Sequence, residues 1–406
     1  MKRVVVTGMA GISPIGQDWS SVQARMAKGD NAVVRMEAWD SAEQMHTRLA
    51  CPVTDFEKPA HYKRKAVRSM GRVSLMATVA TERALDDAGL LGDPVIQSGA
   101  MGVAYGSSTG STDPIKAFGR LLDDGDMTGV TATSYIQMMA HTTAVNVGVF
   151  FGLKGRVHTT SSACTSGSQA IGYAFEAIRS GRQTMMVAGG AEELCISEAA
   201  VFDTLFATST RNDQPQQTPR PFDRDRDGLV IGEGACTLIL EEREHALARG
   251  ATIYAEVLGF GTNSDGLHVT QPNQETMAVA MQQALDDADL SADDIGYVCA
   301  HGTATDRGDV AESNATAAVL GRKPISSLKS YVGHTLGACG ALEAWWSIEM
   351  MRQGWFAPTI NLDQVDELCG DLDYITGSGR KMVIDKVMSN NFAFGGINTS
   401  LIFARP

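Results

Sequence analysis

The sequence predicts an α/β fold made of two similar halves, and three observations predict it. Short β-branched runs alternate with helical stretches along all 406 residues, a pattern typical of sheets whose strands are connected by helices. The 42 glycines exceed the usual share of about 7% and gather where strands meet helices. A weak internal repeat relates residues 163–181 to residues 336–354. The two halves should join near residue 250, which gives domains at 1–250 and 251–406.

The individual elements follow from hydrophobic periodicity and from the residues at their ends. Asp18 and Gly29, for example, are suitable caps for the first helix. We expect the strands to be mostly parallel, because helical crossovers connect them. Buried strands are predicted at Val4–Thr7, Gly102–Tyr105, Met185–Ala188, Cys236–Leu240, Ile253–Leu258 and Val298–Ala300. Helices are predicted at Trp19–Lys28, Val73–Ala88, Ser166–Ile178, Met277–Ala288, Val310–Leu320 and Ala341–Arg352.

The repeat aligns two glycine-rich helix starts. The stretch around Cys164 corresponds to the stretch around Gly337, so that Gly167 matches Gly340 and Arg179 matches Arg352. Small residues at both helix starts predict that the two helices approach each other or a sheet closely. The pair Gly189-Gly190 is interpreted as a turn.

Charge and cysteine content exclude several classes of function. The net charge of −13 argues against nucleic acid as the main partner, because phosphate neutralisation requires surplus cations. No window reaches the about 18 apolar residues of a membrane span, and the apolar stretch after Met1 is too short for a signal peptide. Seven cysteines without a CxxC pair favour a reducing, cytoplasmic location. The run Asp223–Gly228 lacks calcium-loop spacing and predicts a local ion-pair network.

Cys164 is the candidate nucleophile. A strand leads into it and a helix of small residues leads out, so the thiol would lie at a helix N-terminus, which lowers a thiol pKa. The alternative, a small buried hydrophobic residue, is the usual state of a free cysteine. We expect that alternative for Cys51, Cys195, Cys236 and Cys369.

Two histidines follow apolar segments at places where strands are predicted to end. His301 and His334 each stand beside glycine and small hydroxyl residues, so both imidazoles could point at one reacting centre. Neither shows a zinc-ligand spacing, and no metal site is predicted. A hydrogen-bonded structural histidine is the alternative for each. The tail Phe392–Asn398 adds a glycine pair after Phe394, which suits an oxyanion hole but equally a plain turn.

These residues together make the chain resemble the elongating β-ketoacyl-acyl carrier protein synthases, types I and II, of the thiolase superfamily. The resemblance covers essentially residues 1–406. It rests on Cys164 in Ser-Ala-Cys, on His301 in His-Gly-Thr, on His334 after Gly333, on Lys329 and on Phe394-Gly395-Gly396. It implies a five-layered αβαβα homodimer of two thiolase-like halves, or a heterodimer with a synthase-like partner.

The resemblance also implies a mechanism and its residues. Cys164 would take an acyl chain from the phosphopantetheine of acyl carrier protein, and His301 and His334 would stabilise the enolate formed from malonyl-carrier protein. The enzyme itself would bind no cofactor. The supporting assignments are an oxyanion hole at the N–H groups of Cys164 and Phe394, a gate at Phe394, an ordering role for Lys329 with Glu343, pantetheine contacts at Thr303 and Thr305, and an acyl pocket bordered by Thr109 and Phe202.

Three related classes of protein differ from this chain at residues that carry the chemistry, and one basic segment suits an acidic carrier protein. Priming type III synthases carry Asn where this chain has His334, a thiolase needs a second catalytic cysteine, and a chain-length-factor-like partner lacks the nucleophile. The densest basic run contains Arg64, Lys65 and Arg68, which are predicted to share a helix side with Arg72 and to dock the acidic carrier. A second basic cluster expected near residues 120–127 is replaced by aspartates.

Two departures from the family pattern indicate a specialised synthase. Cys299 stands where an Asn usually helps to hold a structural cation beside the counterparts of Glu343, Ser389 and Asn390, so no cation is assigned. Asp306-Arg307 replaces the usual Pro after the His-Gly-Thr motif, and the polar Thr109 at the expected border of the acyl pocket points the same way. The chain looks most similar to ketosynthases of bacterial aryl polyene clusters, with ordinary type II fatty acid elongation as the alternative.

Overall fold

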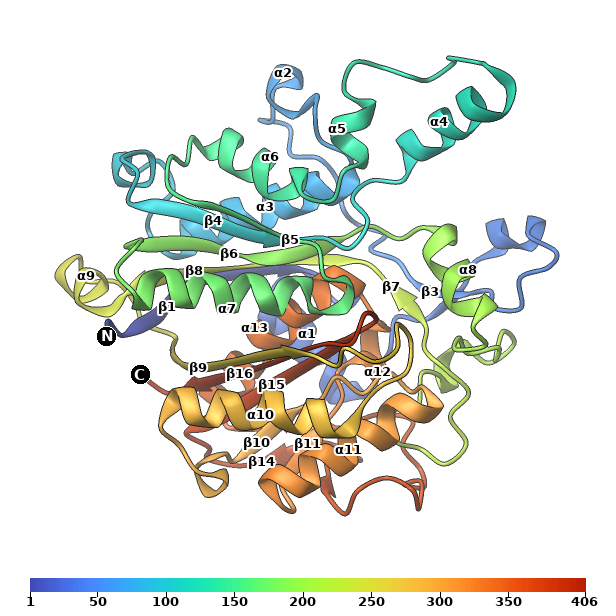
Figure 1. The fold of residues 1–406 in the computed structure, drawn as a ribbon, viewed down its shortest axis with the longest axis vertical. Coiled ribbons are helices and arrows are strands. Elements are labelled where there is room, and N and C mark those ends of the chain that lie inside the picture. Colours follow the sequence, from blue (N-terminus) through green and yellow to red (C-terminus); the bar gives the residue numbers. More distant parts are fainter.

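The computed structural model describes residues 1–406 and contains a single 11-stranded sheet together with two small ones. The large sheet consists of two half-sheets that meet where β1 pairs with β9 in an antiparallel register, Val4 opposite Val257. Figure 1 shows the half-sheets spreading apart from this junction and enclosing helices between them. The first half-sheet contains β1 (Val4–Ile12), β4 (Met101–Gly106), β5 (Val157–Thr160), β6 (Met185–Glu192) and β8 (Gly234–Glu242). The second contains β9 (Ala255–Ser264), β10 (Tyr297–Cys299), β11 (Pro324–Ser326), β13 (Asp373–Tyr374), β15 (Lys386–Ala393) and β16 (Ile397–Ala404).

The two half-sheets repeat one topology. The order β5-β4-β6-β8-β1 in the first corresponds to β11-β10-β15-β16-β9 in the second. The pairing directions also correspond: the first two pairs of each series are parallel and the last two are antiparallel. The expectation of mostly parallel strands is therefore wrong. Hydrophobic periodicity identifies a buried strand but carries no information about the direction of its neighbour.

Helices and half-sheets alternate in five layers (Figure 1). The outer layers are α3 (Arg72–Asp87) with α6 (Thr142–Phe151), and α10 (Gln274–Ala288) with α11 (Asp306–Leu320). The central layer is α7 (Ser166–Arg179) and α13 (Cys339–Gln353), which pack against each other and against both half-sheets. The remaining helices are α1 (Trp19–Lys28), α2 (Arg64–Val67), α4 (Asp113–Asp124), α5 (Ser134–Met138), α8 (Ile196–Thr204), α9 (Arg243–Ala248) and α12 (Lys329–Val332). The small sheets contain β2 (Val34–Arg35), β3 (Leu49–Cys51), β7 (Ile231–Gly232), β12 (Trp355–Phe356) and β14 (Arg380–Lys381).

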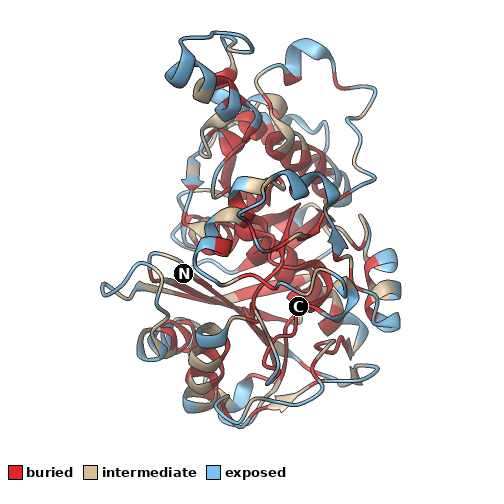
Figure 2. Cartoon of the chain, turned by 90° about the vertical axis from the view of Figure 1, so that its right-hand side faces the viewer, coloured by how far each residue is buried: buried red, intermediate tan, exposed pale blue.

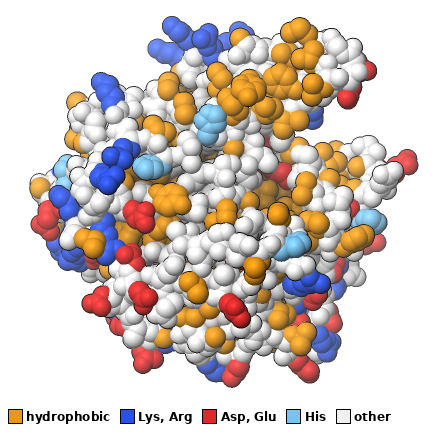
Figure 3. Space-filling model, viewed as in Figure 1, with side chains coloured by type: hydrophobic (Ala, Val, Ile, Leu, Met, Phe, Trp, Pro, Cys, Tyr) orange, Lys and Arg blue, Asp and Glu red, His pale blue; other side chains and the backbone are white.

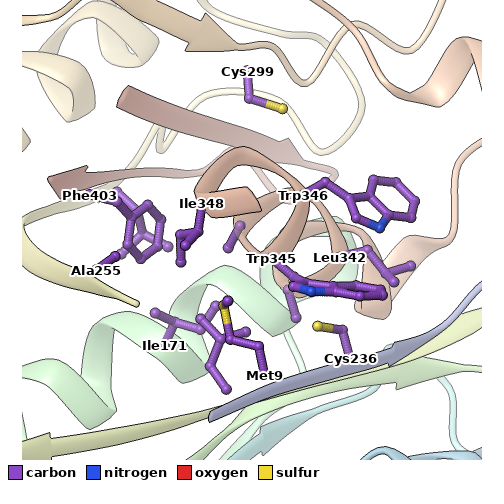
Figure 4. Close-up of a cluster of buried hydrophobic side chains, with 14 of the residues drawn as sticks. Met9, Ile171, Cys236, Ala255, Cys299, Leu342, Trp345, Trp346, Ile348 and Phe403 are labelled. Carbon is purple, nitrogen blue, oxygen red and sulfur yellow. The ribbon is translucent and has the colours of Figure 1, made fainter. Parts of the chain in front are cut away.

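The core is thickest around the central helices. Figure 2 shows buried residues running through the middle of the molecule and exposed ones confined to outer helices and loops. Side chains from both halves meet in this cluster: Ile171 of α7 and Trp345 of α13 lie between Met9 of β1 and Phe403 of β16 (Figure 4). A helix that is buried on all sides needs apolar or small residues all round, which explains the composition of α7 and α13. None of the helices combines the length and the hydrophobicity that a membrane span requires.

Candidate active site

Close contact between α7 and α13 brings the two halves of the site together. A Cβ at Gly167 would lie 2.9 Å from the carbonyl oxygen of Gly337, and a Cβ at Gly340 would lie 2.7 Å from the backbone nitrogen of Ser168. The backbone just before each helix has the same strained shape, with φ of 50° at Ala163 and 46° at Leu336. Such positive φ values are uncommon outside glycine. The internal repeat thus corresponds to two equivalent turns that face each other.

Glycines in the neighbouring strand serve the same contact. Gly189 and Gly190 lie inside β6, so the predicted turn there is wrong. A Cβ at Gly190 would come within 2.2 Å of the Gly337 oxygen. A glycine inside a strand often marks close approach of another backbone, and that signal was available in the sequence.

The thiol of Cys164 lies at the tip of the first turn. It follows β5 through the 3-10 turn η3 (Ala163–Thr165) and precedes α7, and its side chain is buried. Burial raises the pKa of Cys164 to about 11, although the charge of Lys329 and the N–H groups of Phe394 and Cys164 itself lower it. The expectation of a low resting pKa is therefore wrong, because desolvation exceeds the effect of the helix end. The same two N–H groups are those assigned to the oxyanion hole.

Both imidazoles lie beside this sulfur. His334 Nε2 is 2.9 Å from Cys164 Sγ, and the rings of His301 and His334 meet edge to face with centroids 5.1 Å apart. His301 follows β10 as expected, whereas His334 follows the short helix α12 rather than a strand. One nitrogen of each ring and the sulfur lie within 4.8 Å of one another.

The hydrogen bonds fix the tautomer of each ring. Leu336 N–H donates to Nδ1 of His334 at 3.3 Å, and the Asn391 amide nitrogen lies 3.4 Å from Nδ1 of His301. Burial, assisted by the charge of Lys329, holds the pKa of both histidines well below the usual range. Each ring is therefore neutral with its proton on Nε2. An Nε2–H group is a hydrogen-bond donor and offers no lone pair to a metal, so the two histidines are arranged as donors around the nucleophile Cys164.

A buried ion pair is connected to His301 through the side chain of Asn391. Lys329 Nζ lies 2.5 Å from Glu343 Oε1, and Asn391 donates to Glu343 Oε2 at 2.7 Å. Burial lowers the pKa of Lys329, but the other contributions, above all the Glu343 carboxylate, raise it by more than burial lowers it. The net pKa is therefore raised and the amine stays charged. Asn391 connects this pair to His301, a role that was not predicted. The signal for it was a run of polar residues inside a strand that is otherwise buried.

A second buried carboxylate holds the His301 loop. Glu312 of α11 accepts the N–H groups of His301 at 2.7 Å and Gly302 at 2.6 Å. Burial raises the pKa of Glu312 to about 8, while these two N–H groups lower it. This residue was also missed, because its partners are backbone groups that a sequence does not display.

The polar pocket next to Glu343 does not suit a structural cation of the oxygen-liganded kind. Ser389 Oγ and both side-chain polar atoms of Asn390 are buried without a partner. Burial raises the pKa of Cys299, so the residue in the usual Asn position is a neutral thiol. The charge of Glu343 is already balanced by Lys329. Hard cations require several oxygen ligands, and ligand charge adds to their affinity. Here Ser389 and Asn390 offer neutral oxygens only, the Glu343 carboxylate is compensated, and the Cys299 thiol is a sulfur ligand.

A cavity of about 490 Å³ leads from the surface to the thiol. Its lining includes Cys164, both histidines, Phe202 and Phe394. The ring centroids of Phe202 and Phe394 are 5.0 Å apart, and both rings pack in the same cluster as Cys164. Thr303 and Thr305, whose hydroxyls are 2.9 Å apart, line the same cavity. Thr109 does not line it; its hydroxyl donates to Glu198 at 2.8 Å, and its place in an acyl pocket stays a prediction.

The basic run lies on the surface but not on one helix. Arg64 and Lys65 belong to the four-residue α2, Arg68 follows it, and all three are exposed without an ion-pair partner. Arg72 begins α3 instead and pairs with buried Glu233 at 2.9 Å. The expectation that Arg72 shares their face is therefore wrong. The Asp223 run does form ion pairs, including Arg220 with Asp223 and Arg226 with Asp366.

Comparison with known proteins agrees with this geometry. The model of the beta-ketoacyl synthase N-terminal domain matches residues 1–246, and that of the C-terminal domain matches residues 254–363. The chain belongs to the beta-ketoacyl synthase family and is an acyltransferase of the ketosynthase type. It is 39% identical to 3-oxoacyl-[acyl-carrier-protein] synthase 2 of Vibrio harveyi over 100% of this chain and 99% of the relative.

Solved structures give the same fold. A beta-ketoacyl synthase from Burkholderia phymatum matches with a TM-score of 0.99 and 65% identity over 100% of both chains. The ketosynthase AntDE, solved with its acyl-carrier protein AntF and bound to a hexaketide, matches with a TM-score of 0.88 and 31% identity, covering 100% of this chain and 99% of that one. The ketosynthase ApeO of Xenorhabdus doucetiae, in complex with its chain length factor ApeC, matches with a TM-score of 0.85 and 25% identity. This match covers 100% of this chain and 98% of that one.

Proposed function

We propose that this chain condenses an acyl chain on Cys164 with malonyl-acyl carrier protein, losing CO₂. The observation that carries the proposal is the arrangement of Cys164 Sγ, His334 Nε2 and His301 around one buried point. A nucleophile with two neutral N–H donors is what a decarboxylative condensation requires, because negative charge develops on a thioester oxygen in each step.

The first step loads the enzyme. The Cys164 thiolate attacks the acyl thioester on phosphopantetheine, and the N–H groups of Cys164 and Phe394 hold the resulting oxyanion. The carbon–sulfur bond to pantetheine then breaks, and the proton lost by Cys164 ends on the pantetheine sulfur. One such oxyanion donor contributes about 2.7–4 kcal/mol in the transition state.

The second step forms the carbon–carbon bond. The malonyl carboxylate leaves as CO₂, and its bonding electrons form an enolate whose oxygen accepts the Nε2–H groups of His301 and His334. The enolate carbon attacks the acyl group, and Cys164 leaves as thiolate. Lys329 and Glu343 position Asn391 and the histidines and do not touch the substrate in this scheme.

The pathway we favour is chain elongation of the fatty acid synthase type. The 39% identity to a 3-oxoacyl-[acyl-carrier-protein] synthase exceeds the 25% identity to the ketosynthase ApeO. The aryl polyene assignment rests on Asp306-Arg307 and the polar Thr109, and these residues do not by themselves select an aryl chain. It is therefore the second candidate.

Carrier docking and pairing of subunits complete the proposal. The exposed cations Arg64, Lys65 and Arg68 suit an acidic carrier protein. Strand β5 ends the large sheet, and its Val157 is 51% exposed. Helix α6 packs against β5, and its Val149 is 76% exposed. An open edge strand with apolar neighbours invites pairing with another chain. We propose a homodimer through this edge, with a synthase-like partner on the same edge as the alternative. We also propose that the boundary between the two halves of the chain lies at residue 250.

Acyl transfer to Cys164 tests the function. Wild-type protein incubated with acyl-carrier protein should gain the mass of one acyl group, and Cys164→Ser should gain none. Cys339→Ser is the matched control, because this second buried thiol donates to the Cys164 carbonyl oxygen but does not line the cavity. A folded wild-type protein that never acquires the acyl mass would instead be a catalytically silent partner.

A further inference from the structure

One charged side chain on the cavity wall has no partner. The wall is exposed at one end, where Phe206, Val269, Asp306 and Arg307 reach the solvent, and buried at the other, where Cys164 lies. Arg307 therefore stands at the mouth. No hydrogen bond or ion pair joins its guanidinium to another residue, whereas Asp306 lies 3.5 Å from Arg226.

Every other charged group that lines the cavity already has a hydrogen-bond or ion-pair partner. The side chain of Arg226 is only 2% exposed and donates to the carbonyl oxygens of Thr305 and Asp306 and to Asp366. The carboxylates accept hydrogen bonds: Glu312 from backbone N–H groups, Asp265 from Asn398, and Asp227 from Ser209 and Thr210. Arg307 is thus the one cation of the cavity that is free to bind a ligand.

The backbone around Arg307 adds a second attraction for an anion. Arg307 is the second residue of α11, a helix of 15 residues, so it lies at the positive end of the helix dipole. Thr303 and Thr305 precede it and line the same cavity. A ligand that reaches Cys164 through this cavity therefore passes the two hydroxyls, and its outer end lies at Arg307.

We propose that Arg307 binds the phosphate of the phosphopantetheine arm, an inference that rests on the proposed function. The arm between thioester and phosphate is uncharged, and the malonyl carboxylate belongs at the inner, reacting end. The phosphate is then the one anion of the substrate that reaches the mouth. The planar guanidinium matches two phosphate oxygens in geometry and charge.

The test compares two small substrates that differ in the phosphate alone. Transfer of a hexanoyl group to Cys164 is followed by intact mass, from hexanoyl-S-pantetheine and from hexanoyl-S-phosphopantetheine. We expect wild type to load about five- to tenfold faster from the phosphorylated substrate, the range of a charge-assisted contact near solvent. The ratio should fall to near one in Arg307→Gln and recover in part in Arg307→Lys. Arg322→Gln is the matched control, because Arg322 is exposed beyond the other end of α11, outside the cavity.

The outcomes separate this inference from the proposed function. If wild type loads from both substrates without preferring the phosphate, or if Arg307→Gln keeps the wild-type ratio, the assignment of Arg307 is wrong while the function stands. A loss that appears only with intact carrier protein would mean that Arg307 contacts acidic side chains of the carrier instead. Failure of wild type to load from any thioester would contradict the proposed function itself.

Discussion

Two opposing influences act on the thiol of Cys164. Burial raises its pKa to about 11, whereas the positive charge of Lys329 and two backbone N–H groups lower it. At neutral pH the thiolate fraction of the resting site is then on the order of 10⁻⁴. The chemistry therefore depends on groups that favour the anion at the moment of attack, and Lys329 supplies a full positive charge that does so.

Replacing Lys329 should slow alkylation of Cys164 at fixed pH. Loss of its positive charge raises the thiol pKa further, so Lys329→Met should lower the rate with iodoacetamide at pH 8 by about tenfold, equivalent to one pKa unit. The wild-type rate should still be rising at pH 9–10. Lys381→Ala, an exposed lysine of β14, is the control. The variant Lys329→Met/Glu343→Gln removes both buried charges, which checks that an unpaired carboxylate is not the cause. A wild-type profile that is flat above pH 7 would contradict this account.

The sequence pointed to the residues with chemistry of their own. Of the residues that act through neighbours, it pointed to Lys329 and Glu343 only through the family resemblance, and to Asn391 and Glu312 not at all. Cys164, His301 and His334 stand in short motifs of glycine and hydroxyl residues. Asn391 and Glu312 act by holding a ring or a loop, and their partners are far away in the chain. The thiol pKa also could not be predicted, because burial is a property of the fold.

At the scale of elements, the crossing of α7 and α13 determines whether the thiol and the imidazoles meet. The helix starts touch through Gly167 and Gly340, which leaves no room for a side chain at either position. The repeat in the sequence predicted these two helices and their small residues correctly. It also predicted that the two helices approach each other or a sheet closely, and the structure shows both contacts. It could not predict that β8, β9, β16 and β1 run antiparallel to their neighbours.

Gly340→Ala should separate the two helices. The added methyl would lie 2.7 Å from the Ser168 nitrogen and from Asn391 Oδ1, and such overpacking costs about 1–3 kcal/mol of stability. We expect a lower melting temperature and slower acyl loading of Cys164. Gly119→Ala is the control, because a Cβ there meets nothing within 4 Å in helix α4. That change should stabilise the protein slightly, by about 0.4–1 kcal/mol. Equal behaviour of the two variants would show that the contact between α7 and α13 is not tight.

At the scale of the whole molecule, charge is distributed unevenly on an acidic protein. The net charge is −13, yet Figure 3 shows basic side chains gathered at the upper edge, over α2, beside an apolar patch over α4 and α5. The exposed apolar residues of that patch include Ile115, Leu122 and Tyr135. A local cationic site on an acidic surface favours an acidic partner and raises its rate of encounter.

Reversing charge at Arg64 and Arg68 should weaken turnover with carrier-bound substrate only. The double variant Arg64→Glu/Arg68→Glu is expected to raise KM for acyl-carrier protein about tenfold or more, since each exposed pair contributes up to about 1 kcal/mol and the new charges repel the carrier. Its rate with a small thioester should stay at the wild-type value, and the difference should shrink at high salt. Arg182→Glu/Lys381→Glu, which reverses two exposed cations outside the basic run, is the control. Equal losses on both substrates would contradict docking at this site.

The central claim is that Cys164 and the two histidines together form a carbon–carbon bond with loss of CO₂. The most direct measurement is mass spectrometry of the carrier protein after incubation with this protein, acyl-carrier protein and malonyl-carrier protein. We predict a 3-oxoacyl product two carbons longer than the acyl donor, formed by wild type and absent with His334→Ala at comparable folding. Loading of Cys164 without any elongated product, under conditions in which malonyl-carrier protein remains intact, would contradict the claim.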